Sequence, residues 1–182
     1  MSTTSAAVGD RAGVRSRPDT IGTWALGVAT VATGLFAGLI WTFAVAIDRA
    51  EERLGPVAYA TWRQFLIRDL DRGILPVLVL TVLAPLVALV ALRHRRGSTA
   101  WRLAAVSFLI YLIGVMAYTV LLNVPINNAM LDWDAASPPS DWADQRDRWD
   151  LLNTIRTPVT IAVFVGYLLA LTGLVRDRAR AV

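Results

Sequence analysis

Four long stretches without a charged residue alternate with short charged segments along the chain. No Asp, Glu, Lys, Arg or His occurs at positions 21–47, 73–92, 103–131 and 157–175. A helix needs about 20 apolar residues to cross the roughly 30 Å hydrocarbon core of a bilayer, so each stretch is long enough for one span. The pattern therefore predicts an all-α fold: a four-helix transmembrane bundle with spans at about 21–47, 73–93, 102–124 and 157–175.

The segment before the first span is small and polar, and its charged residues include Arg11, Arg15 and Arg17. We expect residues 1–19 to form a disordered cytoplasmic tail in front of a membrane domain at 20–182. The apolar part of a cleaved signal peptide is about 7–15 residues long. The first charge-free stretch is longer, which favours a retained span.

The distribution of arginine predicts the orientation. The N-terminal segment, the loop 93–102 and the C-terminal tail carry three, four and three Arg. The loop 48–72 balances five Arg with five acids, and the loop 132–156 has three Arg and six Asp. Because positively charged loops stay inside, we expect both termini in the cytoplasm of a cell-membrane protein. The arginines then face anionic lipid as their partner, and no nucleic-acid partner is expected.

Both longer loops contain an amphipathic helical pattern. At 57–72 the apolar side predicts a helix that lies on the membrane surface or caps the bundle. The segment 141–156 predicts a second helix that leads into span four, which we expect to begin at Thr157-Pro158. Pro125 is expected to end the regular part of span three. Gly34 and Gly38 form a GxxxG pattern, for which packing inside the bundle is favoured over a homo-oligomer contact.

Several classes of membrane protein need residues that this chain lacks. It has no Cys for thiol or disulfide chemistry, and its single His94 lies in a loop rather than in a span, where a haem ligand is needed. The charge-free stretches hold no ionisable group of the kind that proton pumps use. We expect neither a metal site nor a cofactor.

Polar side chains gather at one depth, near the outer ends of spans three and four. Asn123 and Asn127 lie at the end of span three, while Trp149, Asn153 and Arg156 follow at i, i+4 and i+7 on one face of the helix before span four. Buried amides need hydrogen-bond partners, so we expect the two groups to contact each other. The group has two compatible interpretations, a structural lock between the helices and a binding or catalytic pocket.

The same residues resemble a bacterial membrane family that includes the anthrone-oxygenase-like proteins. The resemblance lies in Asn123-Val-Pro-Ile-Asn127 and, after a loop with Trp142, in Arg148-Trp149-Asp-Leu-Leu-Asn153-Thr-Ile-Arg156-Thr157. It implies a membrane enzyme that oxidises anthrones with molecular oxygen and without a cofactor. Members with this activity tend to have His at the position of Asn153, and an amide cannot serve as a general base.

Two hypotheses about function follow. In the first, a cofactor-independent oxygenase acts on a lipophilic aromatic substrate. Arg156 and Asn153 are then catalytic, and Asn123, Asn127 and Trp149 bind the substrate. In the second, the chain is a non-enzymatic scaffold, accessory or lipid-binding bundle, and the same residues are structural.

Overall fold

The computed structural model describes residues 17–180, and every element in this part of the chain is a helix. The principal helices are α1 (Arg17–Thr42), α2 (Asp48–Glu51), α3 (Pro56–Ala91), α4 (Thr99–Tyr111), α5 (Val124–Leu131) and α6 (Trp142–Ala179). A short 3₁₀ turn, η2 (Arg93–Arg95), joins α3 to α4, and three π-helical segments interrupt the spans: η1 (Phe43–Ile47), η3 (Leu112–Ala117) and η4 (Thr119–Asn123).

Four of the resulting rods are long and apolar enough to cross a membrane, at Arg17–Glu51, Arg72–Ala91, Thr99–Leu131 and Trp142–Asp177. Large apolar side chains such as Val31, Leu35, Ile113 and Leu121 are exposed along them. Soluble monomers rarely expose apolar patches on this scale. The chain is therefore an all-α, multi-pass membrane protein, and the predicted bundle is confirmed.

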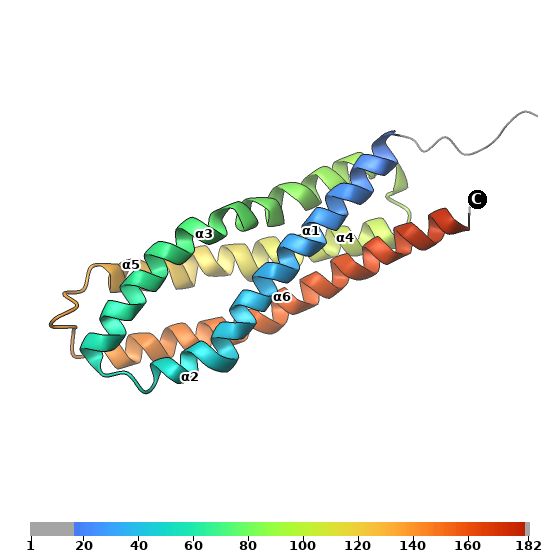
Figure 1. The fold of residues 1–182 in the computed structure, drawn as a ribbon. Helices are drawn as coiled ribbons and strands as arrows, with labels where there is room; N and C mark the ends of the chain where they lie inside the picture. The colour runs from blue at the N-terminus through green and yellow to red at the C-terminus, as the bar shows by residue number, and fades with distance from the viewer. Residues whose placement is uncertain (1–16, 181–182) are drawn as a thin grey trace, which may run out of the picture.

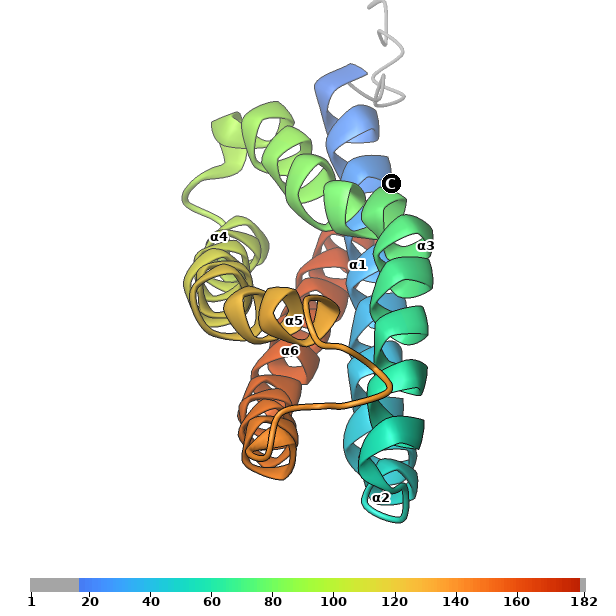
Figure 2. The same ribbon diagram turned by 90° about the vertical axis from the view of Figure 1, so that its left-hand side faces the viewer.

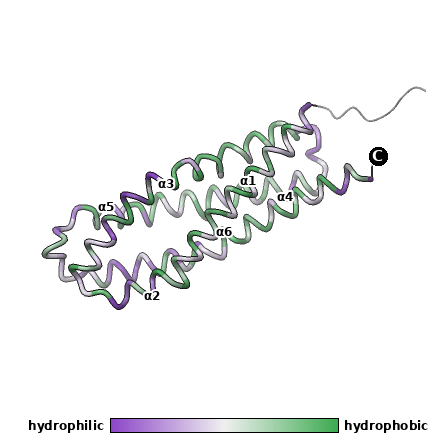
Figure 3. Tube along the Cα trace, viewed as in Figure 1, coloured by the Kyte–Doolittle hydropathy of each residue, from purple (hydrophilic) through white to green (hydrophobic). Residues whose placement is uncertain are grey.

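The four rods run up, down, up and down, so both ends of the described chain lie at the same end of the bundle (Figure 1). We call this the termini end, and the opposite end, which carries α2 and α5, the distal end. Viewed from the distal end, α1 and α3 lie on one side and α4 and α5 on the other, with α6 beside α1 (Figure 2). Hydrophilic residues gather at the two ends, with hydrophobic ones between them (Figure 3).

Local sequence signals explain where several helices begin. Pro56 starts α3 after the extended Gly55, in a first turn whose N–H groups have no acceptor within the helix, so the missing N–H of proline costs no helical hydrogen bond. Ser98 caps α4, because its hydroxyl accepts a hydrogen bond from the Trp101 backbone N–H at 3.2 Å.

The expected tail needs a correction at its end. The first helix begins at Arg17, so residues 17–19 are helical. Asp19 pairs with Arg95 at 2.8 Å and lies 3.1 Å from the His94 ring nitrogen, which fixes the start of α1 to the turn after α3. The remainder of the expected tail, residues 1–16, lies outside the described residues.

The two amphipathic segments are not separate helices. The segment 57–72 lies in the first half of α3, which passes without interruption into span two. Of the segment 141–156, residues 142–156 likewise form the start of α6. Pro158 consequently lies inside a helix and not in a first turn. Around it, the hydroxyls of Thr157 and Thr160 donate to the carbonyls of Asn153 and Arg156 at 2.8 and 3.1 Å, which supplies side-chain hydrogen bonds in this part of the helix.

The third rod also continues past its expected end. It does not stop near residue 124 but runs to Leu131, because the π-helical η4 precedes Pro125 and places it in the first turn of α5. A proline in that position breaks no hydrogen bond of α5. The polar residues at 123 and 127 are thereby held on continuous helix rather than on a loop.

Gly34 permits close packing inside the bundle. A Cβ atom placed on Gly34 would come within 2.8 Å of the Phe164 ring of α6, whereas none of the described residues lies within 4 Å of the corresponding position on Gly38. The first glycine of the GxxxG pattern thus serves an intramolecular contact. A homo-oligomer contact through Gly38 stays the alternative that the sequence does not favour.

Candidate functional site

The two groups of motif residues meet at the distal end, as the sequence predicts. The indole Nε1 of Trp149 on α6 donates a hydrogen bond to Oδ1 of Asn127 on α5 at 2.9 Å. Trp149 is buried and also packs on Phe43 of η1, with the ring centroids 5.6 Å apart. The bond ties the end of the third rod to the fourth.

Arg156 lies about two helical turns beyond Trp149 on α6 and is 6 % exposed. Its Nη1 donates to the Thr119 hydroxyl at 2.6 Å, and its Nη2 donates to Asn153 Oδ1 at 3.1 Å. The guanidinium carbon stands 5.9 Å from the centre of the Phe36 ring. No ion pair to Arg156 occurs among the described residues, and its Nε has no hydrogen-bond partner there. The cation is therefore buried without a carboxylate.

Asn153 connects Arg156 to the first rod. It is fully buried, and its Nδ2 lies 3.4 Å from the carbonyl oxygen of Ile40, while its oxygen accepts from Arg156. Ile40 lies three residues before the π-helical segment η1, and Thr119 is the first residue of η4. Short π-helical segments frequently occur at functional sites. Here they lie on two of the rods that surround Arg156.

Asn123 stands apart from the other motif residues. It is 2 % exposed, yet neither its oxygen nor its nitrogen has a hydrogen-bond partner among the described residues. It does not line the cavity described next. The structure thus brings together Asn127, Trp149, Asn153 and Arg156, and leaves the expected substrate-binding role of Asn123 a prediction.

A cavity of about 120 Å³ lies between the rods at this level. Its wall is mostly apolar, with polar groups contributed by the third and fourth rods; it is lined by Phe36, Leu39, Ile40, Phe43, Leu70, Ile74, Leu78, Met116, Thr119, Asn127, Trp149, Asn153 and Arg156. An apolar pocket with a few convergent polar groups is the usual form of a small-molecule site. This cavity is the candidate site.

The sequence matches the family model for anthrone oxygenase over residues 62–166, which is more than half of the 182-residue chain. The chain belongs to the anthrone oxygenase family. The matched region contains both motifs and every polar residue that lines the cavity. No curated protein and no solved structure matches the chain.

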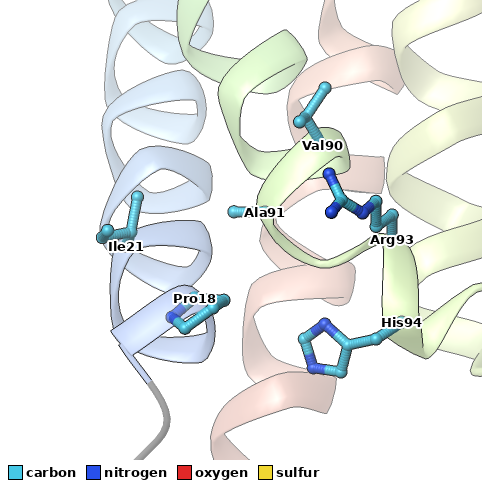
Figure 4. Close-up of a pocket in the computed structure, with 6 residues that line it drawn as sticks. All are labelled: Pro18, Ile21, Val90, Ala91, Arg93 and His94. Carbon is cyan, nitrogen blue, oxygen red and sulfur yellow. The ribbon is translucent and has the colours of Figure 1, made fainter.

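A second hollow of about 560 Å³ lies at the termini end of this anthrone oxygenase family member, between the start of α1 and the end of α3 (Figure 4). It is lined by Pro18, Ile21, Val90, Ala91, Arg93 and His94. His94 is already engaged by Asp19 at 3.1 Å, and no motif residue of the family is near. Larger volume alone does not make this hollow the better candidate, because none of the family's motif residues lines it.

Sequence analysis missed a buried ion pair behind the cavity. Arg63 is 1 % exposed; its Nη1 donates to Oε2 and Oε1 of Glu51 at 2.8 and 3.1 Å. Its guanidinium also stacks on Trp149, 3.7 Å from the ring centre. The Trp62 indole donates to the same carboxylate at 2.8 Å. Arg63 therefore covers one face of the motif tryptophan, in an arrangement that stabilises cation and ring alike.

Asp48 and Asp150 join this group, since one oxygen from each lies within 4.8 Å of a Glu51 oxygen and of the other. A signal for part of the group was present in the sequence. Asp48 and Glu51 are three residues apart directly after a span, hence on one helical face. Arg63 and Asp150 have no such local signal, because only the fold brings them near.

Replacing Asn127 with Leu should lower the stability of the bundle by about 1–3 kcal/mol, because the part-buried Trp149 N–H loses its acceptor. The measurement is thermal unfolding in detergent. Asn128→Leu is the matched control, since Asn128 is the exposed neighbour on the same helix. Equal melting temperatures for the two variants would contradict a stabilising role of the bond.

Proposed function

We propose that this protein is a membrane oxygenase that oxidises a lipophilic phenolic aromatic of the anthrone type with molecular oxygen and without a cofactor. Family membership supports the reaction class. The observation that carries the proposal is Arg156, a buried cation in the wall of an apolar cavity with no carboxylate partner among the described residues. A buried unpaired charge is costly, and an anionic substrate would offset that cost.

The cavity walls suggest how such a substrate is held. A phenolate or enolate oxygen would face Arg156, whose Nε is free to donate, with the amides of Asn153 and Asn127 nearby. The aromatic ring would lie along Trp149 and Phe43. Because Arg63 occupies one face of the Trp149 ring, the substrate would take the side that borders the cavity.

The reaction needs little from the protein beyond this arrangement. An anthrone loses a proton from its central CH₂ group to water and becomes an enolate, which is electron-rich enough to reduce oxygen directly. One oxygen atom ends as the new carbonyl of the quinone and the other leaves as water, so that anthrone and O₂ give anthraquinone and H₂O. By stabilising the enolate oxygen in a site of low polarity, Arg156 would favour its formation.

The cavity is narrow for a three-ring substrate. A volume of about 150 Å³ accommodates a single benzene ring, and the present cavity has about 120 Å³. The cavity would therefore have to widen even for the oxygenated ring, and the flexible side chain of Met116, which lines it from the third rod, would move aside.

We further propose that the distal end lies on the outer side of the cell membrane. The segments with arginine and little acid flank the termini end, and such segments stay in the cytoplasm. The cavity would then lie near the outer boundary of the hydrocarbon core, where an apolar substrate arrives from the lipid and the released proton reaches water.

The decisive experiment is oxygen uptake by the purified protein in nanodiscs supplied with an anthrone. We expect uptake and appearance of quinone absorbance in equal molar amounts, at a rate at least about tenfold above empty nanodiscs, because transition-state stabilisation of even 1.4 kcal/mol gives that factor. A rate equal to that of empty nanodiscs would refute the proposal for this substrate class.

The second candidate function is that of a non-enzymatic scaffold, accessory or lipid-binding bundle, in which the motif residues only hold the helices together. The hydrogen bonds that join Trp149 to Asn127 and Arg156 to Thr119 favour it, because they link the third and fourth rods directly. If the protein is an oxygenase, a motif variant should lower the rate of oxygen uptake. If the motif is structural, the variant should lower the melting temperature.

A further inference from the structure

Three carboxylates converge behind the candidate site. Asp48 and Glu51 come from α2, the last turn of the first rod, and Asp150 comes from α6. One oxygen from each lies within 4.8 Å of an oxygen of both others. The group thus joins two rods whose sequence positions are about a hundred residues apart.

The carboxylate of Asp48 is the least satisfied member. Its side chain is 6 % exposed, and neither oxygen has a hydrogen-bond partner of normal geometry among the described residues. The Asn153 amide lies close to it but makes no such bond. Asp150 is half-buried, and its Oδ1 is equally without a partner. Buried polar groups almost always have partners, so these oxygens point to a missing one.

The charges around the group point to a cation. Arg63 pairs with Glu51, and Arg146 pairs with Asp147 at 2.7 Å. Within residues 17–180, Asp48 and Asp150 therefore form no ion pair of their own and only share the field of these two arginines. Glu52, which follows Glu51, adds a further acid. Close buried carboxylates repel one another strongly. A single divalent ion would supply the two missing positive charges.

We infer that Asp48, Glu51 and Asp150 form a binding site for a divalent cation that prefers oxygen ligands: Mg²⁺, Mn²⁺ or Ca²⁺. Such ions bind carboxylate oxygens at about 2.0–2.6 Å, so two ligands of one ion stand at most about 5 Å apart, in agreement with the observed spacing. All three ligands are carboxylates, which suits these ions better than metals that select imidazole or thiolate. Water would complete the coordination.

The cation would tie the end of the first rod to α6. Asp150 directly follows Trp149 and is three residues before Asn153, so a metal held by Asp150 would fix the part of α6 that carries both. The inference is independent of the proposed oxygenase activity, because the site is defined by binding and not by turnover.

The test is titration of Mn²⁺ into the full-length protein in zwitterionic nanodiscs after removal of metals with EDTA. Free Mn²⁺ is followed by electron paramagnetic resonance. We expect saturable binding of about one ion per chain, displaced by Ca²⁺ or Mg²⁺. Asp48→Asn and Asp150→Asn should each weaken binding at least about tenfold, as is usual when a metal site loses a group. No substrate is present, so the result does not depend on activity.

Asp144→Asn is the matched control, because Asp144 is exposed on the same helix; it should bind Mn²⁺ like the unaltered protein. Without metal, Asp48→Asn and Asp150→Asn should melt no lower than the unaltered protein, since each removes a repelling charge, and this shows that the variants fold. With metal, only the unaltered protein and Asp144→Asn should gain stability.

Mn²⁺ binding no greater than to empty nanodiscs would overturn the inference. The three carboxylates would then relieve their repulsion by sharing protons instead of a metal ion. The same follows if Asp48→Asn and Asp150→Asn both bind Mn²⁺ as tightly as Asp144→Asn.

Discussion

Arg63→Ala is expected to destabilise the bundle by about 3–5 kcal/mol, the usual cost of removing one member of a buried ion pair. Glu51, only 1 % exposed, would lose its cation and be left with the Trp62 indole. Trp149 would also lose the guanidinium that packs 3.7 Å from its ring centre. The measurement is thermal or denaturant-induced unfolding in detergent.

Arg68→Ala provides the control, because Arg68 is an exposed arginine five residues further along the same helix. It should change stability by no more than about 0.5 kcal/mol. The double variant Glu51→Gln with Arg63→Met should recover much of the loss, since it removes both charges and keeps the volume. A loss of less than 1 kcal/mol for Arg63→Ala would contradict the ion pair as described.

Arg156→Gln is expected to lower the rate of oxygen uptake by about 10²–10³-fold, the usual effect of removing one oxyanion-stabilising donor. Its melting temperature should stay close to that of the unaltered protein, or rise, because the variant removes a buried charge that no carboxylate of residues 17–180 balances. Both quantities are measured on one preparation in nanodiscs.

Two further variants sharpen this test. Arg156→Lys keeps the charge but loses the pair of guanidinium N–H groups that reach Thr119 and Asn153. Its rate of oxygen uptake should therefore lie between that of the unaltered protein and that of Arg156→Gln. Arg148→Gln, at an exposed position on the same helix, should have full activity. Unchanged turnover with a lowered melting temperature in Arg156→Gln would favour the structural role of the motif.

Much of the fold follows from the sequence because absence of charge is a strong signal. The four charge-free stretches alone predict the spans, and the spacing of Trp149, Asn153 and Arg156 predicts the face that borders the cavity. Helix ends are less predictable. Pro125 and Pro158 suggest boundaries, yet the chain continues through both, in one case by way of π-helical turns and in the other inside α6.

Some contacts among the polar residues of the site could be predicted from the sequence, and others could not. Asn127 and Trp149 could be paired in advance, because each lies at the same depth on a neighbouring rod. Arg63 and Glu51 could not, since the loop around them appears balanced in charge and exposed when read along the chain. Only the continuation of α3 into that loop brings Arg63 under the ring of Trp149.

The long uninterrupted helices α3 and α6 both extend beyond the membrane. At about 1.5 Å per residue, the 36 residues of α3 and the 38 of α6 form rods of about 54 and 57 Å, while the hydrocarbon core is only about 30 Å thick. In each helix the part that projects beyond the lipid is continuous with the part that lines the cavity. A water-soluble molecule that binds these projecting parts would therefore contact, without entering the lipid, the same two helices that contribute Leu70 and Trp149 to the cavity wall.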